Sequence, residues 1–309
     1  MANRAFGVQN FSMLNSIKKQ LQIAEDCLKK NKIPSFIIDA EIILAHVLNK
    51  SKEFIYTYPE FALTKKQISE FQTLIDRRTK GEPVAYLTNH KEFYGLDLLV
   101  NKDTLIPRPE TEILVDESIK LIHDSCSMIH DVVDIGTGAG GVAIAIATHT
   151  ANVRAQNFVP QPFAMNTLAT DISARALIVS KKNAKKHCVK IKFYHGNLYQ
   201  PVLNKKIDLV VANLPYGWKE WKNNCSMDSK GLKFEPAIAL FTKEKGLYLY
   251  RKLFEQIQKA KYLPKYILLE FDPRQTTDIK KLARRFFPNA KISIIKDLAG
   301  KNRVIKMQI

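Results

Sequence analysis

The sequence predicts an α/β protein with an open, mostly parallel sheet and a small helical domain in front of it. Three observations support this. From residue 131 onward, short apolar runs alternate with helical segments, and a glycine-rich turn follows the first of these runs. The preceding residues 1–82 carry helical periodicity alone. A length of 309 residues fits two domains, at about 150 residues per domain.

Residues 1–82 are predicted to be the helical domain. Apolar positions repeat at helical spacing in three segments: Ile17, Leu21, Ala24 and Leu28; Ile38, Ile42, Ala45 and Leu48; Ile68, Phe71, Leu74 and Ile75. Pro34 and Ser35 mark the start of the second segment. Arg77 and Arg78, followed by Gly81, are a sound stop signal for the third.

Residues 83–105 are predicted to be a β-hairpin linker. The apolar residues Val84 and Tyr86, the segment 93–96 and the segment 98–100 suggest two short strands around a turn. After Pro109 a helix resumes.

Residues 106–309 are predicted to form the α/β domain. Its strands are expected at 132–135, up to Asp171, and at 190–194, 207–212, 266–270, 291–296 and 303–308. Its helices are expected at 142–148, 174–186, 246–260 and 276–286. The last two strands are joined by a short connection with Gly300, which favours an antiparallel hairpin. Residues 151–168 are long for a βα connection and predict an insertion loop.

Charge and composition narrow the class of protein. Forty-eight basic and thirty acidic side chains give a net charge of +18, which suits a polyanionic neighbour such as RNA or an acidic protein, or reflects a lysine-rich proteome. No apolar run approaches the ~18 residues of a membrane span, and the first residues do not resemble a secretory signal. The four cysteines form no C-x-x-C pair, so neither a zinc site nor a disulfide framework is expected. We expect a cytoplasmic protein without a metal.

The glycine-rich turn is the first candidate site. A strand containing Asp134 leads into Gly136, Gly138 and Gly140, which open a helix. Such a turn lets a ligand approach the backbone and offers N–H donors at the helix N-terminus. The next acidic strand end, Asp171, is placed to accept hydrogen bonds from two ribose hydroxyls. Together these features favour a nucleoside-bearing cofactor.

The tetrapeptide Asn213-Leu214-Pro215-Tyr216 is the second candidate site, because it directly follows a buried-strand pattern. The Asn213 side-chain oxygen and the Leu214 carbonyl are two acceptors held by a stiff turn. Two such acceptors suit a planar NH2 group, either a carboxamide or an exocyclic amine. They would direct the nitrogen lone pair towards an electrophilic methyl group.

At this point the chain resembles the release-factor glutamine methyltransferase family (HemK/PrmC), which uses S-adenosylmethionine and carries an Asn-Pro-Pro-Tyr motif. The similarity runs through most of the chain. It includes the segments 39–48, 81–87, 92–95, 105–112, 234–240 and 297–304. The resemblance implies a Rossmann-like class I methyltransferase fold.

The resemblance also implies a role for each motif residue. The cofactor would lie along the turn made by Gly136, Thr137, Gly138, Ala139 and Gly140, with support from Asp134. Asp171 would hold the ribose, and Asn197 and Leu198 would flank the adenine. Asn213, Leu214, Pro215 and Tyr216 would hold the substrate amide. Arg108, Glu110 and Glu112 either shape the cleft or are a charged helix start after Pro109.

Three departures from the family pattern concern the substrate more than the reaction. Leu214 stands where the family has its first proline, and Asn-Leu-Pro-Tyr is also the form found in ribosomal RNA adenine dimethylases. Phe271 follows Glu270 where a glycine is usual. The third departure is the expected insertion at 151–168.

The expected function is therefore methylation of the glutamine in the Gly-Gly-Gln loop of peptide-chain release factors, by a monomer whose helical domain recognises the factor. The alternatives are an exocyclic-amine methyltransferase acting on RNA or DNA, and a relative that has lost catalysis. A dinucleotide-dependent dehydrogenase is disfavoured, because no acid–base pair for hydride transfer is visible. The basic stretch 181–190 is interpreted as a solvated helix face.

Overall fold

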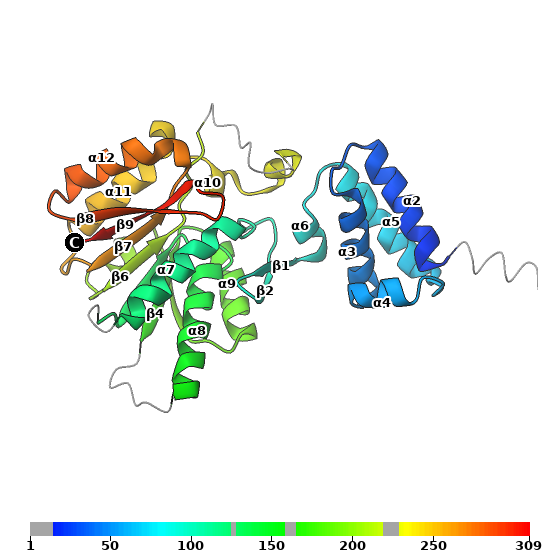
Figure 1. Cartoon of the computed structure of the whole chain (residues 1–309), viewed down its shortest axis with the longest axis horizontal. Helices are drawn as coiled ribbons and strands as arrows, with labels where there is room; N and C mark the ends of the chain where they lie inside the picture. Colours follow the sequence, from blue (N-terminus) through cyan, green and yellow to red (C-terminus); the bar gives the residue numbers. More distant parts are fainter. Residues whose placement is uncertain (1–14, 125–127, 158–164, 219–228) are drawn as a thin grey trace, which may run out of the picture. The chain divides into compact units, whose positions relative to one another are not determined.

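The computed structural model describes residues 15–124, 128–157, 165–218 and 229–309. The chain divides into two compact units (Figure 1). One comprises Met1–Asn89 and Lys222–Phe234, and the other comprises His90–Trp221 and Glu235–Ile309. We call them the helical unit and the sheet unit.

The helical unit contains five described α-helices: α2 (Ile17–Lys30), α3 (Phe36–Leu48), α4 (Lys52–Thr57), α5 (Lys65–Thr79) and α6 (Val84–Thr88). Side chains of Ser16 and Ser51 cap α2 and α4, and Thr64 forms a reciprocal capping box with Gln67. The core contains the apolar residues of the predicted repeats, among them Ile17, Leu28, Leu44 and Phe71. The three long helices follow the predicted segments.

The segment containing Val84 and Tyr86 is the short helix α6, so its prediction as part of a strand is wrong. Pro83 precedes the helix with an extended backbone, and Asn89 ends it in the left-handed region. This single helical turn buries the adjacent residues Tyr86 and Leu87. The apolar pair Val84 and Tyr86, two positions apart, indicates a strand and therefore misses the helix. The hairpin itself starts later, as β1 (His90–Phe93) and β2 (Leu96–Leu99) around Tyr94 and Gly95, both with positive φ.

The sheet unit is built on a seven-stranded sheet. Its strands are β3 (Asp131–Ile135), β4 (Asn166–Asp171), β5 (Ile191–His195), β6 (Leu209–Ala212), β7 (Tyr266–Glu270), β8 (Lys291–Lys296) and β9 (Asn302–Gln308). Their order is β5-β4-β3-β6-β7-β9-β8, and all neighbours are parallel except β9, which is antiparallel to β7 and to β8. The predicted mostly parallel sheet with a C-terminal antiparallel hairpin is confirmed.

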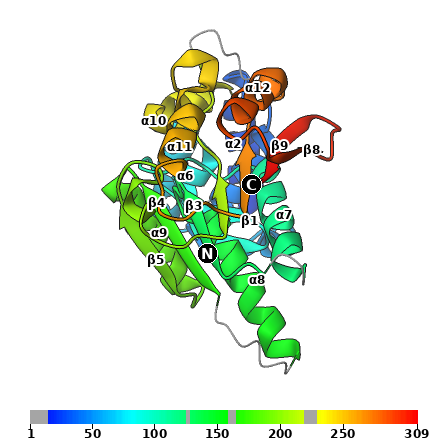
Figure 2. The same ribbon diagram turned by 90° about the vertical axis from the view of Figure 1, so that its left-hand side faces the viewer.

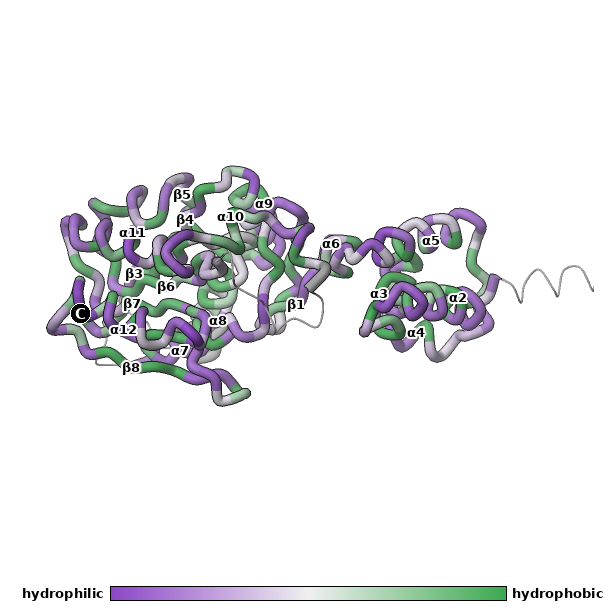
Figure 3. Tube along the Cα trace, turned by 90° about the horizontal axis from the view of Figure 1, so that it is seen from above, coloured by the Kyte–Doolittle hydropathy of each residue, from purple (hydrophilic) through white to green (hydrophobic). Residues whose placement is uncertain are grey.

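Helices cover both faces of this sheet (Figure 2). Alternate strand residues such as Val132 and Leu268 pack with α7 (Glu112–His123) and α8 (Gly141–Asn157). The residues between them, such as Val133 and Leu269, pack with α11 (Tyr248–Ile257) and α12 (Thr276–Phe286). Figure 3 shows the resulting apolar stretches along the central strands. Burial on both faces explains why these strands read as continuous apolar runs.

Helix α8 continues to Asn157, so the expected insertion loop at 151–168 is helical in its first part. Its sequence from 149 to 157 contains neither glycine nor proline, and nothing there ends a helix. Residues 158–164 lie outside the described residues, and β4 begins at Asn166. The remaining described elements of the sheet unit are α9 (Ala174–Lys186), α10 (Ala237–Leu240), η1 (Pro109–Thr111), η2 (Gln200–Val202), η4 (Glu244–Gly246) and η5 (Pro273–Gln275). The 3-10 helix η3 (Ser229–Phe234) belongs to the helical unit.

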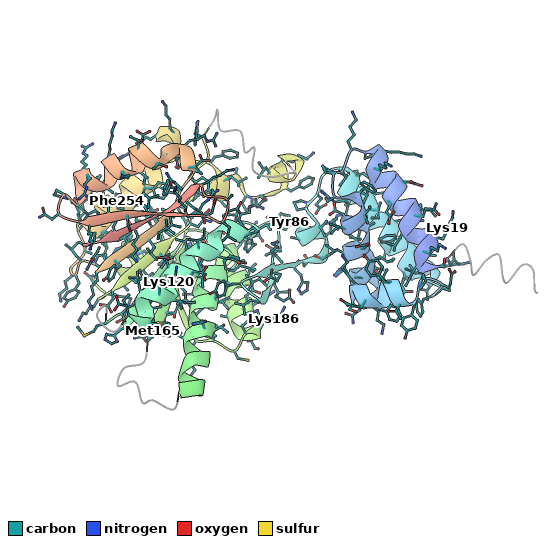
Figure 4. All side chains as sticks on the ribbon, in the orientation of Figure 1. Lys19, Tyr86, Lys120, Met165, Lys186 and Phe254 are labelled. Carbon is teal, nitrogen blue, oxygen red and sulfur yellow. The ribbon has the colours of Figure 1, made fainter. Side chains whose placement is uncertain are left out.

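A buried asparagine of α9 braces the hairpin. The Asn183 side chain accepts a hydrogen bond from the Leu99 N–H (2.7 Å) and donates to the carbonyls of Leu99 and Ala139 (2.9 Å each). Lys186, labelled in Figure 4, adds an ion pair with Asp97 at 2.6 Å. The hairpin and the glycine-rich turn thus share one support.

Candidate active site

The glycine-rich turn leaves the carboxyl end of β3 and enters α8 directly. Gly136, Gly138 and Gly140 all have positive φ, which glycine adopts without strain. A Cβ on Gly140 would lie 2.9 Å from the Ile144 side chain, so this position also needs glycine for packing. Open space surrounds the missing Cβ of Gly138. The turn is therefore accessible at Gly138 and tightly packed at Gly140.

Asp134 supports the turn from beneath. Its side chain is buried, accepts a hydrogen bond from the Thr137 hydroxyl at 2.7 Å and accepts another from the Ala143 N–H. Burial raises the pKa of this carboxyl to about 6, although both hydrogen bonds act in the opposite direction. Asp134 therefore holds the start of α8 in place, at a cost in solvation.

Asp171 lies at the end of β4 and faces the turn. One carboxylate oxygen accepts the Gly138 N–H at 2.9 Å and the other accepts the Ser173 N–H at 2.8 Å. Burial raises the pKa of this carboxyl, against the effect of these two bonds. The Ile172 N–H also acts on this carboxylate, and about four acceptor positions on a carboxylate leave capacity for a ligand hydroxyl.

The Asn213–Tyr216 tetrapeptide follows β6 and is clamped from several sides. The Tyr216 carbonyl accepts a hydrogen bond from the Gln275 side chain at 3.2 Å, and its hydroxyl donates to Glu270 Oε1 at 3.1 Å. A Cβ on Gly246 would lie 2.1 Å from the Tyr216 carbonyl oxygen. The tetrapeptide is therefore held rigidly although its second residue is not a proline.

Leu214 is itself part of this packing. Its side chain is buried, and a Cβ on Gly136 would lie 3.3 Å from it. A leucine at this position thus covers the first glycine of the turn. Phe271, where a glycine was expected, is fully buried in the core beside α11 and α12. Both departures are accommodated by apolar packing.

The turn, Asp171 and the tetrapeptide meet around one cavity of about 200 Å³. Of the predicted residues, those on its wall are Gly136, Gly138, Asp171, Asn197, Leu198, Asn213, Leu214 and Pro215. The wall is completed by residues that were not predicted as site residues, including Thr104, Leu105, Ile172, Ile238 and Leu249, although Leu105 and Ile238 lie in segments that resemble the family. The cavity lies beside the carboxyl ends of β3, β4 and β6, where ligands bind in open α/β sheets.

Five predicted residues do not line this cavity. Asp134, Thr137, Ala139 and Gly140 form the turn behind it, and Tyr216 points to Glu270. The three charged residues after Pro107 do not line it either: Arg108 pairs with the buried Glu235, and Glu112 accepts the Tyr94 N–H at 2.9 Å. Both contacts brace segments beside the cavity. Arg108 stands at the N-cap of η1, Glu110 lies in its first turn, and Glu112 lies in the first turn of α7.

The wall fits a nucleoside cofactor. It is mostly apolar, the Asp171 carboxylate is placed for hydroxyl groups, and the open space beside Gly138 allows a ligand to approach the backbone closely. Among the described residues, no group of histidine, cysteine and acidic side chains could hold a metal ion. No helix in the described part of the chain is long and apolar enough to cross a membrane.

Comparisons with known proteins give the same assignment. The family model described as PrmC N-terminal domain matches residues 19–88, and the model described as methyltransferase small domain matches residues 112–225. A release factor glutamine methyltransferase of Bacillus anthracis is 32% identical, with 87% of this chain and 91% of the relative covered. A solved structure of the hMettl16 catalytic domain with an RNA hairpin is 14% identical, with a TM-score of 0.51 over 86% of this chain and 90% of that chain.

The bifunctional methyltransferase of Rickettsia conorii is also 32% identical, over 94% of this chain. The present chain spans only 57% of that relative's length. The solved structure supports the class I fold alone, whereas the sequence matches extend through both units. The chain belongs to the release factor glutamine methyltransferase family.

Proposed function

We propose that this protein methylates the side-chain amide nitrogen of the glutamine in the Gly-Gly-Gln loop of peptide-chain release factors. The observation that carries the proposal is the meeting of Asn213 and Leu214 with the glycine-rich turn at one cavity. Among the described residues, none donates a hydrogen bond to the Asn213 side-chain oxygen or the Leu214 carbonyl. Both acceptors therefore remain available for the two hydrogens of a substrate NH2 group.

S-adenosylmethionine, when bound along Gly136–Gly140 and Asp171, supplies an electrophilic methyl group on a sulfonium centre. The glutamine nitrogen forms the new N–CH3 bond as the S–CH3 bond breaks, and S-adenosylhomocysteine leaves. One N–H proton then passes to water. Asn213 and Leu214 contribute to catalysis by orienting the substrate. Their oxygens accept both N–H groups, and this aims the lone pair of the poorly nucleophilic nitrogen at the methyl carbon. Such positioning supplies ~7–11 kcal/mol in favourable cases.

We also propose a protein partner, an oligomeric state and a cellular compartment. A release factor binds as the protein substrate, the helical unit takes part in recognising it, and the enzyme acts as a monomer in the cytoplasm. The family match over residues 19–88 supports a recognition role for the helical unit. Light scattering on the purified chain tests the monomer.

The test is transfer of a tritiated methyl group to a recombinant release factor, with the loop glutamine intact or replaced by alanine. We expect label in the intact factor only. Asn213→Ala removes one of the two acceptors and is expected to lower kcat on the order of 100-fold. Asn166→Ala is the matched control, because Asn166 lies at the start of β4, whereas the cavity residue Asp171 lies at its other end.

An exocyclic-amine methyltransferase acting on RNA is the second candidate, favoured by the Asn-Leu-Pro-Tyr form and the charge of +18. Total RNA is therefore the second acceptor in the same assay. Label in RNA with none in the factor would replace the first proposal by this one, and RNA binding would then weaken steeply with salt. Label in neither acceptor would contradict both.

A further inference from the structure

The proposed function, on which this inference rests, requires the Asn213 side-chain amide to keep one orientation. An asparagine amide has an acceptor end and a donor end of nearly the same shape. Only the acceptor end can receive an N–H of the substrate. A flipped Asn213 would present its own NH2 to the substrate NH2, so the site needs something that fixes the orientation.

Thr111 lies at the donor end of this amide. Asn213 Nδ2 donates to Thr111 Oγ1 at 2.8 Å, across 102 positions of sequence. Thr111 is 5% exposed and sits where η1 passes into α7. Its hydroxyl is not a member of the cavity wall. The contact therefore acts on Asn213 and leaves the substrate untouched.

A hydroxyl alone does not settle the orientation, because it both donates and accepts. Glu270, buried at the end of β7, removes this ambiguity. Its Oε1 accepts from the Tyr216 hydroxyl, and its Oε2 is buried without a hydrogen-bond partner among the described residues. The Thr111 hydroxyl lies near enough to this carboxylate to act on its pKa. An ionised carboxylate accepts only, so a Thr111 hydrogen turned towards the unpartnered Oε2 leaves the hydroxyl lone pair for Asn213.

The charge on Glu270 is compensated locally. Burial raises the pKa of Glu270, and the buried Arg303, which pairs with Asp297 at 3.0 Å, opposes this effect and favours the charged carboxylate. The Tyr250 hydroxyl donates to the Glu270 backbone carbonyl at 2.5 Å and fixes the residue. We call the series Glu270, Thr111 and Asn213 the relay. It begins at a carboxylate whose position and charge are both supported by neighbouring residues.

We propose that Thr111 is a positioning residue, which holds the Asn213 amide with its oxygen towards the cavity, and that Glu270 sets the direction of this relay. Each link has one donor and one acceptor: a hydroxyl hydrogen turned from Glu270 to Asn213 would face the Asn213 NH2 and leave a lone pair facing the carboxylate. The relay explains why a threonine beside α7 and a glutamate on β7 belong to the same machinery as the tetrapeptide.

The test uses two pairs of variants that differ by one hydroxyl each: the native threonine against Thr111→Val, and Thr111→Ser against Thr111→Ala. Methyl transfer to the release factor is measured with kcat and KM separated. We expect each hydroxyl-free member to lose on the order of 10- to 100-fold in kcat, with the KM for S-adenosylmethionine unchanged. Thr150→Val is the matched control, because that buried hydroxyl bonds only within α8.

A double-mutant cycle separates positioning from mere structure. If Thr111 acts through Asn213, Thr111→Val causes no further loss of kcat in the Asn213→Ala background. An equal loss in both backgrounds would overturn the proposal, as would a Thr111→Val enzyme within about threefold of wild type. If the valine variant does not fold, the serine and alanine pair decides in the same way. A wild-type enzyme inactive on the release factor would instead contradict the proposed function.

Discussion

The buried side chain of Asp134 holds the glycine-rich turn in place, and its carboxyl loses its contact with water in doing so. Its carboxyl has a pKa of about 6 in the folded chain against an ordinary value near 3.8. Between these values the folded chain retains a proton that the unfolded chain has released. Stability therefore falls as pH rises from about 4 to about 6, and the contribution is fully lost above that range.

Asp134→Asn removes this ionisation while keeping an acceptor for the Thr137 hydroxyl. Relative to wild type, the variant is expected to gain on the order of 3 kcal/mol between pH 4 and pH 7, as measured by urea unfolding. Asp208→Asn provides a contrast, since hydrogen bonds from the His130 and Asp131 N–H groups help to lower the pKa of Asp208. The difference between Asp208→Asn and wild type has the opposite slope and develops below about pH 4, where the unfolded chain takes up the proton first; above pH 4 it is flat. Parallel curves for wild type and Asp134→Asn would contradict the assignment.

Residue roles were predictable where local sequence sets them, and hidden where distant residues set them. The glycines, Asp171 and Asn213 could be predicted because they lie at or directly after apolar strand patterns. Thr111 carries no such signal. Glu270 ends the predicted strand 266–270, but its link to the tetrapeptide arises from a hydrogen bond with Tyr216, far away in sequence. Thr111 lay within the resembling segment 105–112, which is the only hint the sequence contains.

At the scale of elements, the clamp around the Asn213–Tyr216 tetrapeptide depends on the short η4 turn. Gly246 has a φ of +87°, and its missing Cβ leaves room for the Tyr216 carbonyl and the Gln275 amide. Gly246→Ala would bring the new carbon within 2.1 Å of both groups. We expect a loss of more than about 3 kcal/mol in unfolding free energy and a fall in methyl transfer.

Gly300→Ala is the matched control for that substitution. Gly300 also has a positive φ, at +75°, but nothing lies within 4 Å of the added carbon. The expected cost is the backbone term alone, about 1–2 kcal/mol, with transfer unaffected. Equal losses for the two variants would show that the contact with Tyr216 has no effect of its own.

The central strands could be predicted because they are buried on both faces, and their apolar runs are continuous. The errors fall on elements whose ends depend on tertiary contacts. Helix α6 is a single turn, too short for a periodicity to show, and α4 was not predicted for the same reason. Helix α8 was predicted to end too early, because its later residues carry few of the apolar positions that mark a helix.

At the scale of the whole molecule, the two units have separate cores. Every buried residue of the helical core lies between Ile17 and Leu87, and the two sheet cores begin at Phe93 or later. We expect two unfolding transitions, one for each unit. Phe71→Ala is expected to lower only the transition of the helical unit, and Phe254→Ala only that of the sheet unit, each by about 3–5 kcal/mol.

Hydrogen exchange read by mass spectrometry assigns each transition to its peptides. Protection lost throughout the chain in either variant would show that the units unfold as one. The sequence predicted this two-part organisation from the change of periodicity near residue 83. The structure divides the chain at Asn89 and His90, so that α6 falls with the helices and the hairpin with the sheet.

The brace at Asn183 has a consequence for how this chain can diverge. One amide satisfies both backbone groups of Leu99 and also the Ala139 carbonyl in the glycine-rich turn. Few other side chains combine a donor and an acceptor at that reach. A homologue that exchanges Asn183 must therefore re-shape the hairpin and the turn together, so evolutionary change at these three places is expected to be correlated rather than independent.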